Sequence, residues 1–175
     1  MFGEKGYHGA SVTEITRAAG VAQGTFYLYF RGKKEIFLDL VDSLGKRLRE
    51  LTLAARPPGG TYADAQAQGF RAFFELAHNH RAIYRIIQEC DRVDPLTYRR
   101  FYTSLADAYA RGAEDAIQKG EIDAIDPEVL AYAILGIGHF VALRYLIWDD
   151  DYTDKTAESV AHLVERGLRG VSPSA

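Results

Sequence analysis

The sequence predicts an all-helical protein made of a small N-terminal domain, residues 1–46, and a larger domain, residues 47–175. Three observations predict this fold class. Apolar residues recur at three- and four-residue spacing along most of the chain, no segment alternates apolar and polar residues as a strand does, and glycine or proline marks the main breaks. Apolar residues form 47% of the 175 residues, which is enough for a packed core.

The first of two short helices begins with a capping box. The Ser11 hydroxyl can accept a hydrogen bond from the Glu14 amide, while the Glu14 carboxylate can accept one from the Ser11 amide. Gly20 supplies the left-handed residue that commonly ends a helix. The residues that we expect on the inner face share helical spacing and small or apolar side chains: Ile15, Ala18 and Ala19.

The second short helix is expected over Gln23–Tyr29, shortly after Gly20. Two helices joined by a tight turn are typical of a helix-turn-helix, in which the second helix enters the major groove of DNA. Phe26 and Phe30 are four residues apart and are expected in the core, whereas Tyr27 and Tyr29 are expected at the surface. The motif therefore predicts double-stranded DNA as a partner.

A long helix is expected from Lys33 or Lys34 to Arg56, where residues 57–60 (PPGG) end it. Its apolar residues follow a helical spacing: Ile36, Phe37, Leu40, Val41, Leu44, Leu48 and Leu51. We place the domain boundary inside this helix, near Lys46, because one helix links both parts.

Five further helices are expected, over residues 62–78, 81–89, 95–119, 127–149 and 153 or 154–171. Pro95 stands at a helix start, and Asp126-Pro127-Glu128 combines an N-cap residue, a proline and a first-turn acid. The last of these helices has an apolar series in helical register: Ala157, Val160, Ala161, Val164, Leu168 and Val171.

Charge is distributed unevenly along the chain. Residues 1–56 hold nine Lys or Arg against six Asp or Glu, whereas residues 57–175 hold twelve against eighteen. A basic N-terminal part and an acidic remainder are consistent with one DNA-facing end, although ordinary surface scatter also gives such a balance.

Metal-binding and catalytic readings have little support. The single cysteine, Cys90, excludes a disulfide framework and a cysteine-rich zinc site and fits a reducing cytoplasm. His78 and His80 are two residues apart, a poor spacing for metal ligands, and the acidic residues 149–151 and 154 lack the Gly and Glu of an EF-hand loop. Since no catalytic motif or signal peptide is visible, we expect a cytoplasmic protein that is not an enzyme and has no cofactor or metal.

The longest apolar segment, Val129–Trp148, is interrupted by His139 and Arg144, so an interface helix is expected rather than a membrane span. It is rich in small residues that allow close helix approach: Ala131, Ala133, Gly136, Gly138 and Ala142. Because such a helix needs cover on more than one side, we expect a homodimer built from the last two helices of each chain. The alternative is that these helices form the core of a monomer.

Residues 2–37 resemble the DNA-binding domain of the TetR family of bacterial transcriptional regulators. The resemblance is carried by Gly6-Tyr7, Ile15 through Val21, Gly24 through Phe30, and Lys33. It covers about a fifth of the chain. It implies a helix-turn-helix head joined to a helical domain that binds a ligand and dimerises.

The resemblance implies DNA contacts for seven residues: Thr13, Gln23, Gly24, Thr25, Tyr27, Tyr29 and Lys33. Their chemistry agrees, since an amide can read an adenine edge and hydroxyl or ammonium groups can reach phosphates. Ala22 stands where the family often has Ser or Thr, so the second helix should lack a side-chain cap, at a cost of about 1 kcal/mol. Only Met1–Lys5 correspond to the end of the family's first helix, so we expect the chain as given to be truncated and its N-terminal domain loosened.

The larger domain is rich in aromatic residues, many with a polar tip. The residues that we expect around a ligand pocket are Phe70, Phe73, Phe74, Tyr84, Ile87, Tyr98, Phe101, Tyr102, Leu105, Tyr109, His139, Tyr145 and Trp148. Such a pocket suits a small hydrophobic effector, whereas the alternative for each residue is an ordinary place in the core.

These patterns predict a homodimeric repressor that leaves a palindromic DNA operator when a small hydrophobic ligand binds. Two alternatives stay open. An activator would share all the same parts. A dimeric small-molecule carrier or sequestering protein with a vestigial DNA-binding head would share the larger domain.

Overall fold

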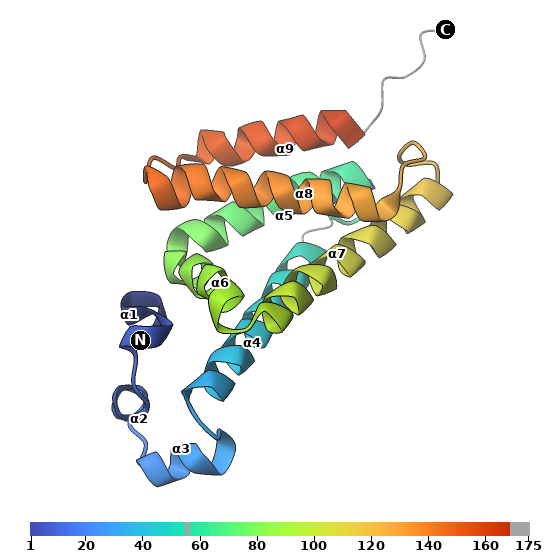
Figure 1. Ribbon diagram of the computed structural model, residues 1–175. Helices are drawn as coiled ribbons and strands as arrows, with labels where there is room; N and C mark the ends of the chain where they lie inside the picture. The colour runs from blue at the N-terminus through green and yellow to red at the C-terminus, as the bar shows by residue number, and fades with distance from the viewer. Residues whose placement is uncertain (55–56, 169–175) are drawn as a thin grey trace, which may run out of the picture. The chain divides into compact units, whose positions relative to one another are not determined.

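The computed structural model describes residues 1–54 and 57–168, and the regular elements in that part of the chain are helices (Figure 1). They are α1 (Phe2–Gly9), α2 (Val12–Ala19), α3 (Gln23–Tyr29), α4 (Lys33–Ala54), α5 (Tyr62–Asn79), α6 (Arg81–Val93), α7 (Pro95–Gln118), α8 (Pro127–Ala142), the π-helical η1 (Leu143–Trp148) and α9 (Asp154–Leu168). The predicted all-helical fold is confirmed. The predicted helix ends at Arg56 and Val171 lie outside the described residues.

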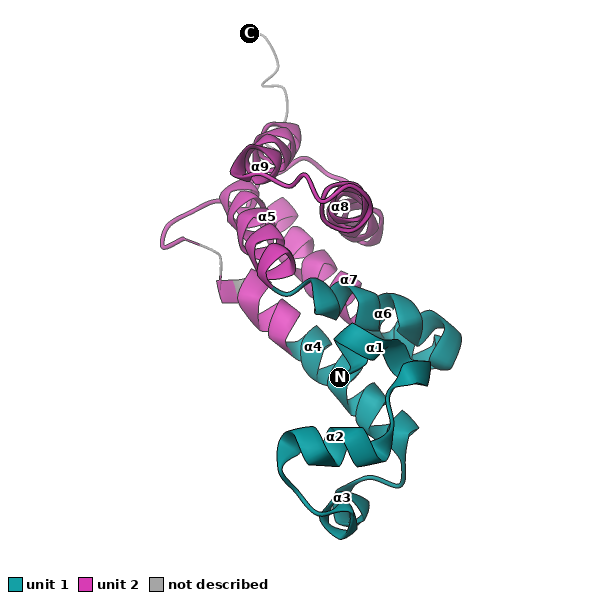
Figure 2. Ribbon diagram, turned by 90° about the vertical axis from the view of Figure 1, so that its left-hand side faces the viewer, with its two compact units in different colours: residues 1–46, 80–102 teal, residues 47–79, 103–175 magenta. Residues whose placement is uncertain are grey.

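The helices form two compact units (Figure 2). Unit 1 contains Met1–Lys46 and His80–Tyr102, and unit 2 contains Arg47–Asn79 and the described residues from Thr103 onward. The divisions between the units fall inside α4, between α5 and α6, and inside α7. Each of these two long helices therefore contributes residues to both units.

The core of unit 1 is aromatic and joins α1 to α4. Phe37 and Val41 of α4 are fully buried. The Phe37 ring meets the rings of Phe2 and Tyr7 edge to face, with centroids 5.2 and 5.0 Å apart. These contacts use the apolar spacing that the sequence predicted for the long helix, and they hold the start of α4 against α1.

Two glycines let α1 approach α6 closely within unit 1. A Cβ atom on Gly3 would lie 2.2 Å from the Cβ of Ala82. Gly6 has φ of 71°, and a Cβ there would lie 2.6 Å from Oε1 of Glu89, whose other oxygen accepts a hydrogen bond from the Tyr7 amide at 2.8 Å. Gly6 thus provides both a left-handed conformation and the space for the Glu89 carboxylate.

Unit 2 is built around α5, which contacts both α8 and α9. Figure 2 shows α8 and α9 nearly end-on, with α5 next to them. The buried face of α9 follows the predicted apolar register at Ala157, Val160, Ala161 and Val164. At the edge of this packing, Arg71 donates two hydrogen bonds to the Glu158 carboxylate, at 2.9 and 3.0 Å.

Two helix ends differ from the predictions. The predicted helix over residues 81–89 continues for another turn, because Cys90 extends the buried face of Ile86 and Ile87. It ends at Val93, since a residue before a proline disfavours helical conformation and Pro95 follows Asp94. The predicted helix over residues 127–149 changes to π-helical geometry at Leu143, which an unbroken apolar pattern does not reveal.

The inner face of α2 also differs from the prediction. Ala18 and Ala19 are exposed and Ile15 is half-buried, while Thr16 is 3% exposed. The Thr16 hydroxyl donates a hydrogen bond to the carbonyl oxygen of Thr13 at 3.1 Å. Because its polar group is satisfied by the helix itself, threonine can take the buried position.

Candidate DNA-binding and ligand-binding sites

The predicted capping box of α2 is confirmed. The Glu14 amide donates to Oγ of Ser11 at 3.2 Å, and the Ser11 amide donates to the Glu14 carboxylate at 3.1 Å. Hydrogen bonds from the Lys5 ammonium and from Ser11 lower the pKa of Glu14 from 4.5 to about 2. A carboxylate that stays ionised at the N-terminus of α2 is also stabilised by the helix dipole.

The position of α3 is fixed by one buried ring and one polar contact. Phe26 is 5% exposed, and its ring centroid lies 5.5 Å from that of Phe30, as the sequence predicted for an inward-facing pair. Ala22 makes no side-chain cap, which confirms that prediction. The Gln23 side chain instead ties α3 to α2 by donating to the Thr13 hydroxyl at 2.6 Å.

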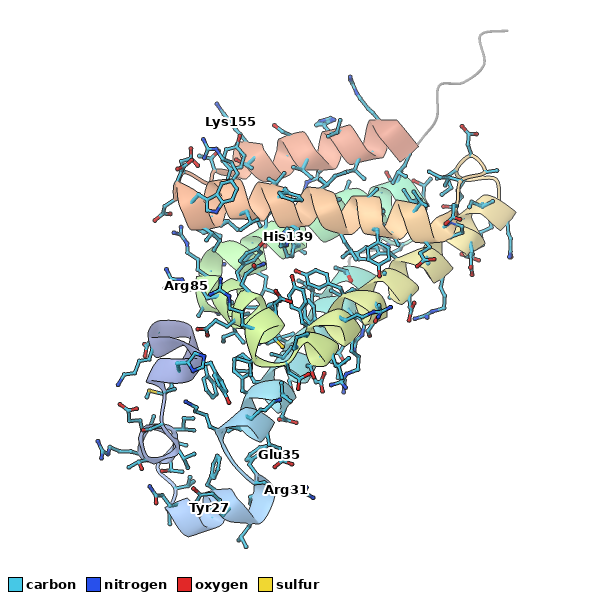
Figure 3. All side chains as sticks on the ribbon, in the orientation of Figure 1. Tyr27, Arg31, Glu35, Arg85, His139 and Lys155 are labelled. Carbon is cyan, nitrogen blue, oxygen red and sulfur yellow. The ribbon has the colours of Figure 1, made fainter. Side chains whose placement is uncertain are left out.

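The outer face of α3 is exposed and mixes polar and apolar groups. Gln23, Gly24 and Thr25 are exposed, and Tyr27 and Tyr29 are 57% and 74% exposed. Figure 3 labels Tyr27 on this helix. These side chains are available to a partner outside the protomer.

Leu28 lies on the same outer face, and the sequence reasoning missed it. It is 80% exposed, the highest value among the large apolar residues in the described part of the chain. Its position two residues after Phe26, and therefore on the opposite side of the helix, was the available signal. An exposed leucine in this position can pack against the methyl group of a thymine.

Lys33 occupies a different kind of position from the other six predicted DNA-contact residues. Its ammonium donates hydrogen bonds to the carbonyl oxygens of Ala10 and His8, at 2.8 and 3.4 Å, and lies 4.6 Å from the centre of the Tyr7 ring. Lys33 therefore joins the start of α4 to the segment between α1 and α2. An ammonium group has three donors, so one can still meet a phosphate.

Asp94 connects helix ends within unit 1. Its carboxylate accepts a hydrogen bond from the Thr97 amide at 3.0 Å, which caps α7, and lies 2.9 Å from the Lys34 ammonium. The hydrogen bond from Lys34 is the main reason that the pKa of Asp94 is lowered. Asp94 thus fixes α4 and α7 to each other next to the end of α6.

Unit 2 contains a cavity of about 100 Å³. It is lined by residues of α4, α5 and α7, namely Arg49, Thr52, Tyr62, Ala65, Gln66, Leu105, Ala108, Tyr109 and Gly112. Burial raises the pKa of the Tyr62 and Tyr109 hydroxyls, so both stay protonated at neutral pH. The cavity therefore combines neutral hydrogen-bonding groups and one cation with a partly apolar wall.

The predicted pocket residues are distributed over both units. Leu105 and Tyr109 line the cavity. Phe70 and Phe74 are buried in unit 2, where Phe73, His139 and Tyr145 are half-buried and Trp148 is 63% exposed. Five of the residues belong to unit 1: Tyr84, Ile87, Tyr98, Phe101 and Tyr102. Burial lowers the pKa of His139, which is labelled on α8 in Figure 3.

The other residues around the cavity were missed because the sequence reasoning looked only for aromatic density. Their signal was a helical spacing of polar groups: Arg49 and Thr52 are three apart, and Tyr62 and Gln66 are four apart. Each pair lies on one face of its own helix, α4 or α5, that lines the cavity.

The segment Pro127–Trp148, made of α8 and η1, is the one stretch among the described residues that is long and apolar enough to cross a membrane. Its mean hydropathy is 1.7, and 33% of its most apolar window is buried. Length and composition alone are weak evidence for a span, because helices at protein interfaces share them.

Comparison with known proteins agrees with this geometry. Residues 1–40 match the family model of the bacterial regulatory proteins of the tetR family. An uncharacterized HTH-type transcriptional regulator of Bacillus subtilis, YhgD, is 24% identical over 168 residues, which is 94% of this chain and 86% of that protein.

Solved structures share the fold over almost the whole chain. A TetR-family regulator from Syntrophomonas wolfei has a TM-score of 0.83 at 21% identity, covering 99% of this chain and 92% of that one. The regulator FadR from Bacillus subtilis, solved in complex with stearoyl-CoA, has a TM-score of 0.80 at 22% identity, covering 95% and 93%.

The capped α2, the tight turn at Gly20 and the exposed face of α3 define a helix-turn-helix regulator with an all-helical body. The family model matched by residues 1–40 and the regulator from Syntrophomonas wolfei carry the same family name, and the relative from Bacillus subtilis is an HTH-type transcriptional regulator. The chain belongs to the TetR family of bacterial transcriptional regulators.

Proposed function

We propose that this regulator is a homodimeric repressor that leaves a palindromic operator when a small hydrophobic effector binds. Residues 1–46 would read DNA, and residues 47–175 would bind the effector and dimerise. The observation that carries the proposal is the outer face of α3, where Tyr27, Leu28 and Tyr29 are exposed rather than packed in the core of their own protomer. Such a face matches the role of a recognition helix.

Contacts to DNA divide into two kinds. The Gln23 amide is suited to an adenine edge and Leu28 to a thymine methyl, so these two residues would supply sequence readout. Thr13, Thr25 and Tyr29 carry hydroxyls suited to phosphate oxygens, and these would set the register on the duplex. A Cβ atom added to Gly24 would meet nothing within 4 Å, which leaves room for close approach of a DNA backbone.

A second copy of the chain is the partner that best suits the uncovered face of α8. Val129, Tyr132 and Phe140 are 61%, 44% and 66% exposed and follow a helical spacing, and Leu163 of α9 is 64% exposed. A Cβ atom on Gly136, which lies in the same series, would meet nothing within 4 Å. Pairing of two such faces about a two-fold axis would cover them and place two recognition helices on successive major grooves.

Release from DNA requires an effector that binds one state of the dimer more tightly than the other. α4 begins shortly after the recognition helix in unit 1 and contributes Arg49 and Thr52 to the cavity in unit 2. It is therefore the natural element to carry a change from the cavity to the head. The structural relative FadR from Bacillus subtilis, solved in complex with stearoyl-CoA, supports an effector that is at least partly apolar.

The dimer is tested by light scattering on the full chain. Phe140→Glu should convert dimer to monomer because it buries a charge in the interface, whereas Glu128→Gln on the first turn of α8 is the control and should leave the dimer intact. A Phe140→Glu variant that stays dimeric would contradict the assignment of this face.

The DNA part is tested by footprinting on the region upstream of the protein's own coding sequence. Two protected half-sites about 10 base pairs apart, or a multiple of that spacing, are expected. A carrier with a vestigial head would protect no site, and an activator would protect a site but raise transcription from it.

A further inference from the structure

The cavity in unit 2 has both polar and apolar lining residues. The polar ones are Arg49 and Thr52 of α4, Gln66 of α5, and Tyr62 and Tyr109. The others are Ala65, Leu105, Ala108 and Gly112. A lining of this composition suits a small ligand that has one polar end and one apolar end.

Gln66 supplies a neutral polar group to the cavity. The residue is 8% exposed and lines the cavity. A glutamine amide carries two N–H donors and one acceptor oxygen. A ligand oxygen in the cavity would accept from the Gln66 amide.

The charge among the lining residues favours an anion. Arg49 is half-buried and forms no ion pair with a described residue, and no acidic side chain lines the cavity within residues 1–54 and 57–168. Guanidinium and carboxylate match in geometry as well as in charge. The Tyr109 hydroxyl is already hydrogen-bonded to Thr52, and the Tyr62 hydroxyl lies 3.5 Å from the Tyr109 carbonyl oxygen.

The volume limits the size of the ligand. An apolar cavity of about 150 Å³ holds one benzene molecule, and this cavity measures about 100 Å³. Gly112 closes one side, because a Cβ atom there would lie 3.3 Å from the Tyr62 ring. The space inside the cavity therefore suits a short apolar tail.

We propose that the cavity binds a small monocarboxylic acid with a short apolar tail. The carboxylate is held by Arg49 and Gln66, and the tail lies against Ala65, Leu105 and Ala108. The acid's role as the effector rests on the proposed repressor function, but its binding to the protein does not.

The test is isothermal titration calorimetry of the full chain with isobutyrate and with its neutral isostere isobutyramide. Isobutyrate should bind at least tenfold more tightly than isobutyramide. Arg49→Gln should remove this preference for the acid, and Gln66→Leu should weaken both ligands at least fivefold. Arg47→Gln, an exposed arginine two residues away that does not line the cavity, is the matched control and should change neither affinity.

A substitution that fills the cavity provides a second test of the proposal. Ala108→Leu should abolish binding of isobutyrate while circular dichroism confirms an intact helical fold. Decanoate should bind more weakly than isobutyrate, because its tail exceeds the cavity. The proposal is overturned by absence of isobutyrate binding at millimolar concentration, by equal affinity for acid and amide, or by unchanged binding in Ala108→Leu.

A titration of the protein with DNA in the absence of the acid tests the proposed repressor function separately from binding of the acid to the cavity. Loss of DNA binding by the ligand-free wild type contradicts the proposed function and leaves the calorimetric result standing. Acid binding that fails in calorimetry overturns the present inference even where DNA binding is tight.

Discussion

Replacing Leu28 with alanine should weaken DNA binding without destabilising the protein, whereas replacing Phe26 should do the reverse. Leu28 is 80% exposed, so only about a fifth of the roughly 1.5–3 kcal/mol of a fully buried leucine is at stake in folding, or about 0.5 kcal/mol. Phe26 is 5% exposed and packs on Phe30. Its replacement by alanine should cost about 3–5 kcal/mol of unfolding free energy.

The effect of Leu28→Ala on DNA follows from the atoms removed. Three carbons pressed against a thymine methyl are worth about 2 kcal/mol at ~0.8 kcal/mol for each buried methylene, which is roughly 30-fold in affinity for each half-site. Urea unfolding measures the stability of both variants, and fluorescence anisotropy with labelled upstream DNA measures the affinity of Leu28→Ala at fixed salt.

Unfolding of Leu28→Ala at a clearly lower urea concentration than the wild type would contradict this prediction, because Leu28 would then belong to the core. An unchanged affinity of Leu28→Ala for DNA would also contradict it, because the outer face of α3 would then not be the surface that contacts the bases. Gln23→Ala, on the same face, provides a comparison and should relax the preference at one base position.

Three further changes test the N-terminal unit. Gly6→Ala should lower the free energy of unfolding by at least about 1–2 kcal/mol, because φ is 71° and the new Cβ meets Glu89, whereas Gly24→Ala has open space and should be neutral in urea unfolding. The pKa of Glu14 is lowered to about 2, so the stability that its contacts contribute is fully present above pH 4.5 and is lost as the pH falls toward 2. Glu14→Gln should therefore make the free energy of unfolding depend less on pH in this acid range. A pH dependence equal to that of the wild type would refute this prediction. Lys33→Ala should weaken binding to all DNA sequences alike and reduce the salt slope by about one, and a slope equal to that of the wild type would leave Lys33 with only its bonds to the backbone.

The sequence predicted the recognition helix well because its signals are local. The bounds Gln23–Tyr29 agree with the prediction, since Gly20 ends α2 and Phe26 and Phe30 define a single inner face. Leu28 shows the limit of that reasoning. An apolar residue type such as leucine predicts a buried side chain, and only the position of Leu28 around the helix axis, opposite Phe26, predicts that it is exposed.

The cavity was harder to predict because three separate helices form it. Arg49, Gln66 and Tyr109 lie on α4, α5 and α7, and no local pattern indicates that their side chains meet. The aromatic residues that suggested a pocket belong to both units, and some are buried while Trp148 is exposed. Aromatic density does not indicate a pocket by itself, because aromatic rings also fill ordinary helical cores. Thr16 shows the same limit on a smaller scale, since its burial depends on a hydrogen bond to Thr13.

The most direct test of the regulator account is a salt titration of binding to DNA from upstream of the protein's own coding region, with random DNA of equal length as the reference. We expect a clear preference for the upstream DNA and a logarithm of the binding constant that falls steeply as salt rises, because two copies of the head contact several phosphates. Equal binding to both DNAs, or affinity that does not respond to salt, would contradict it.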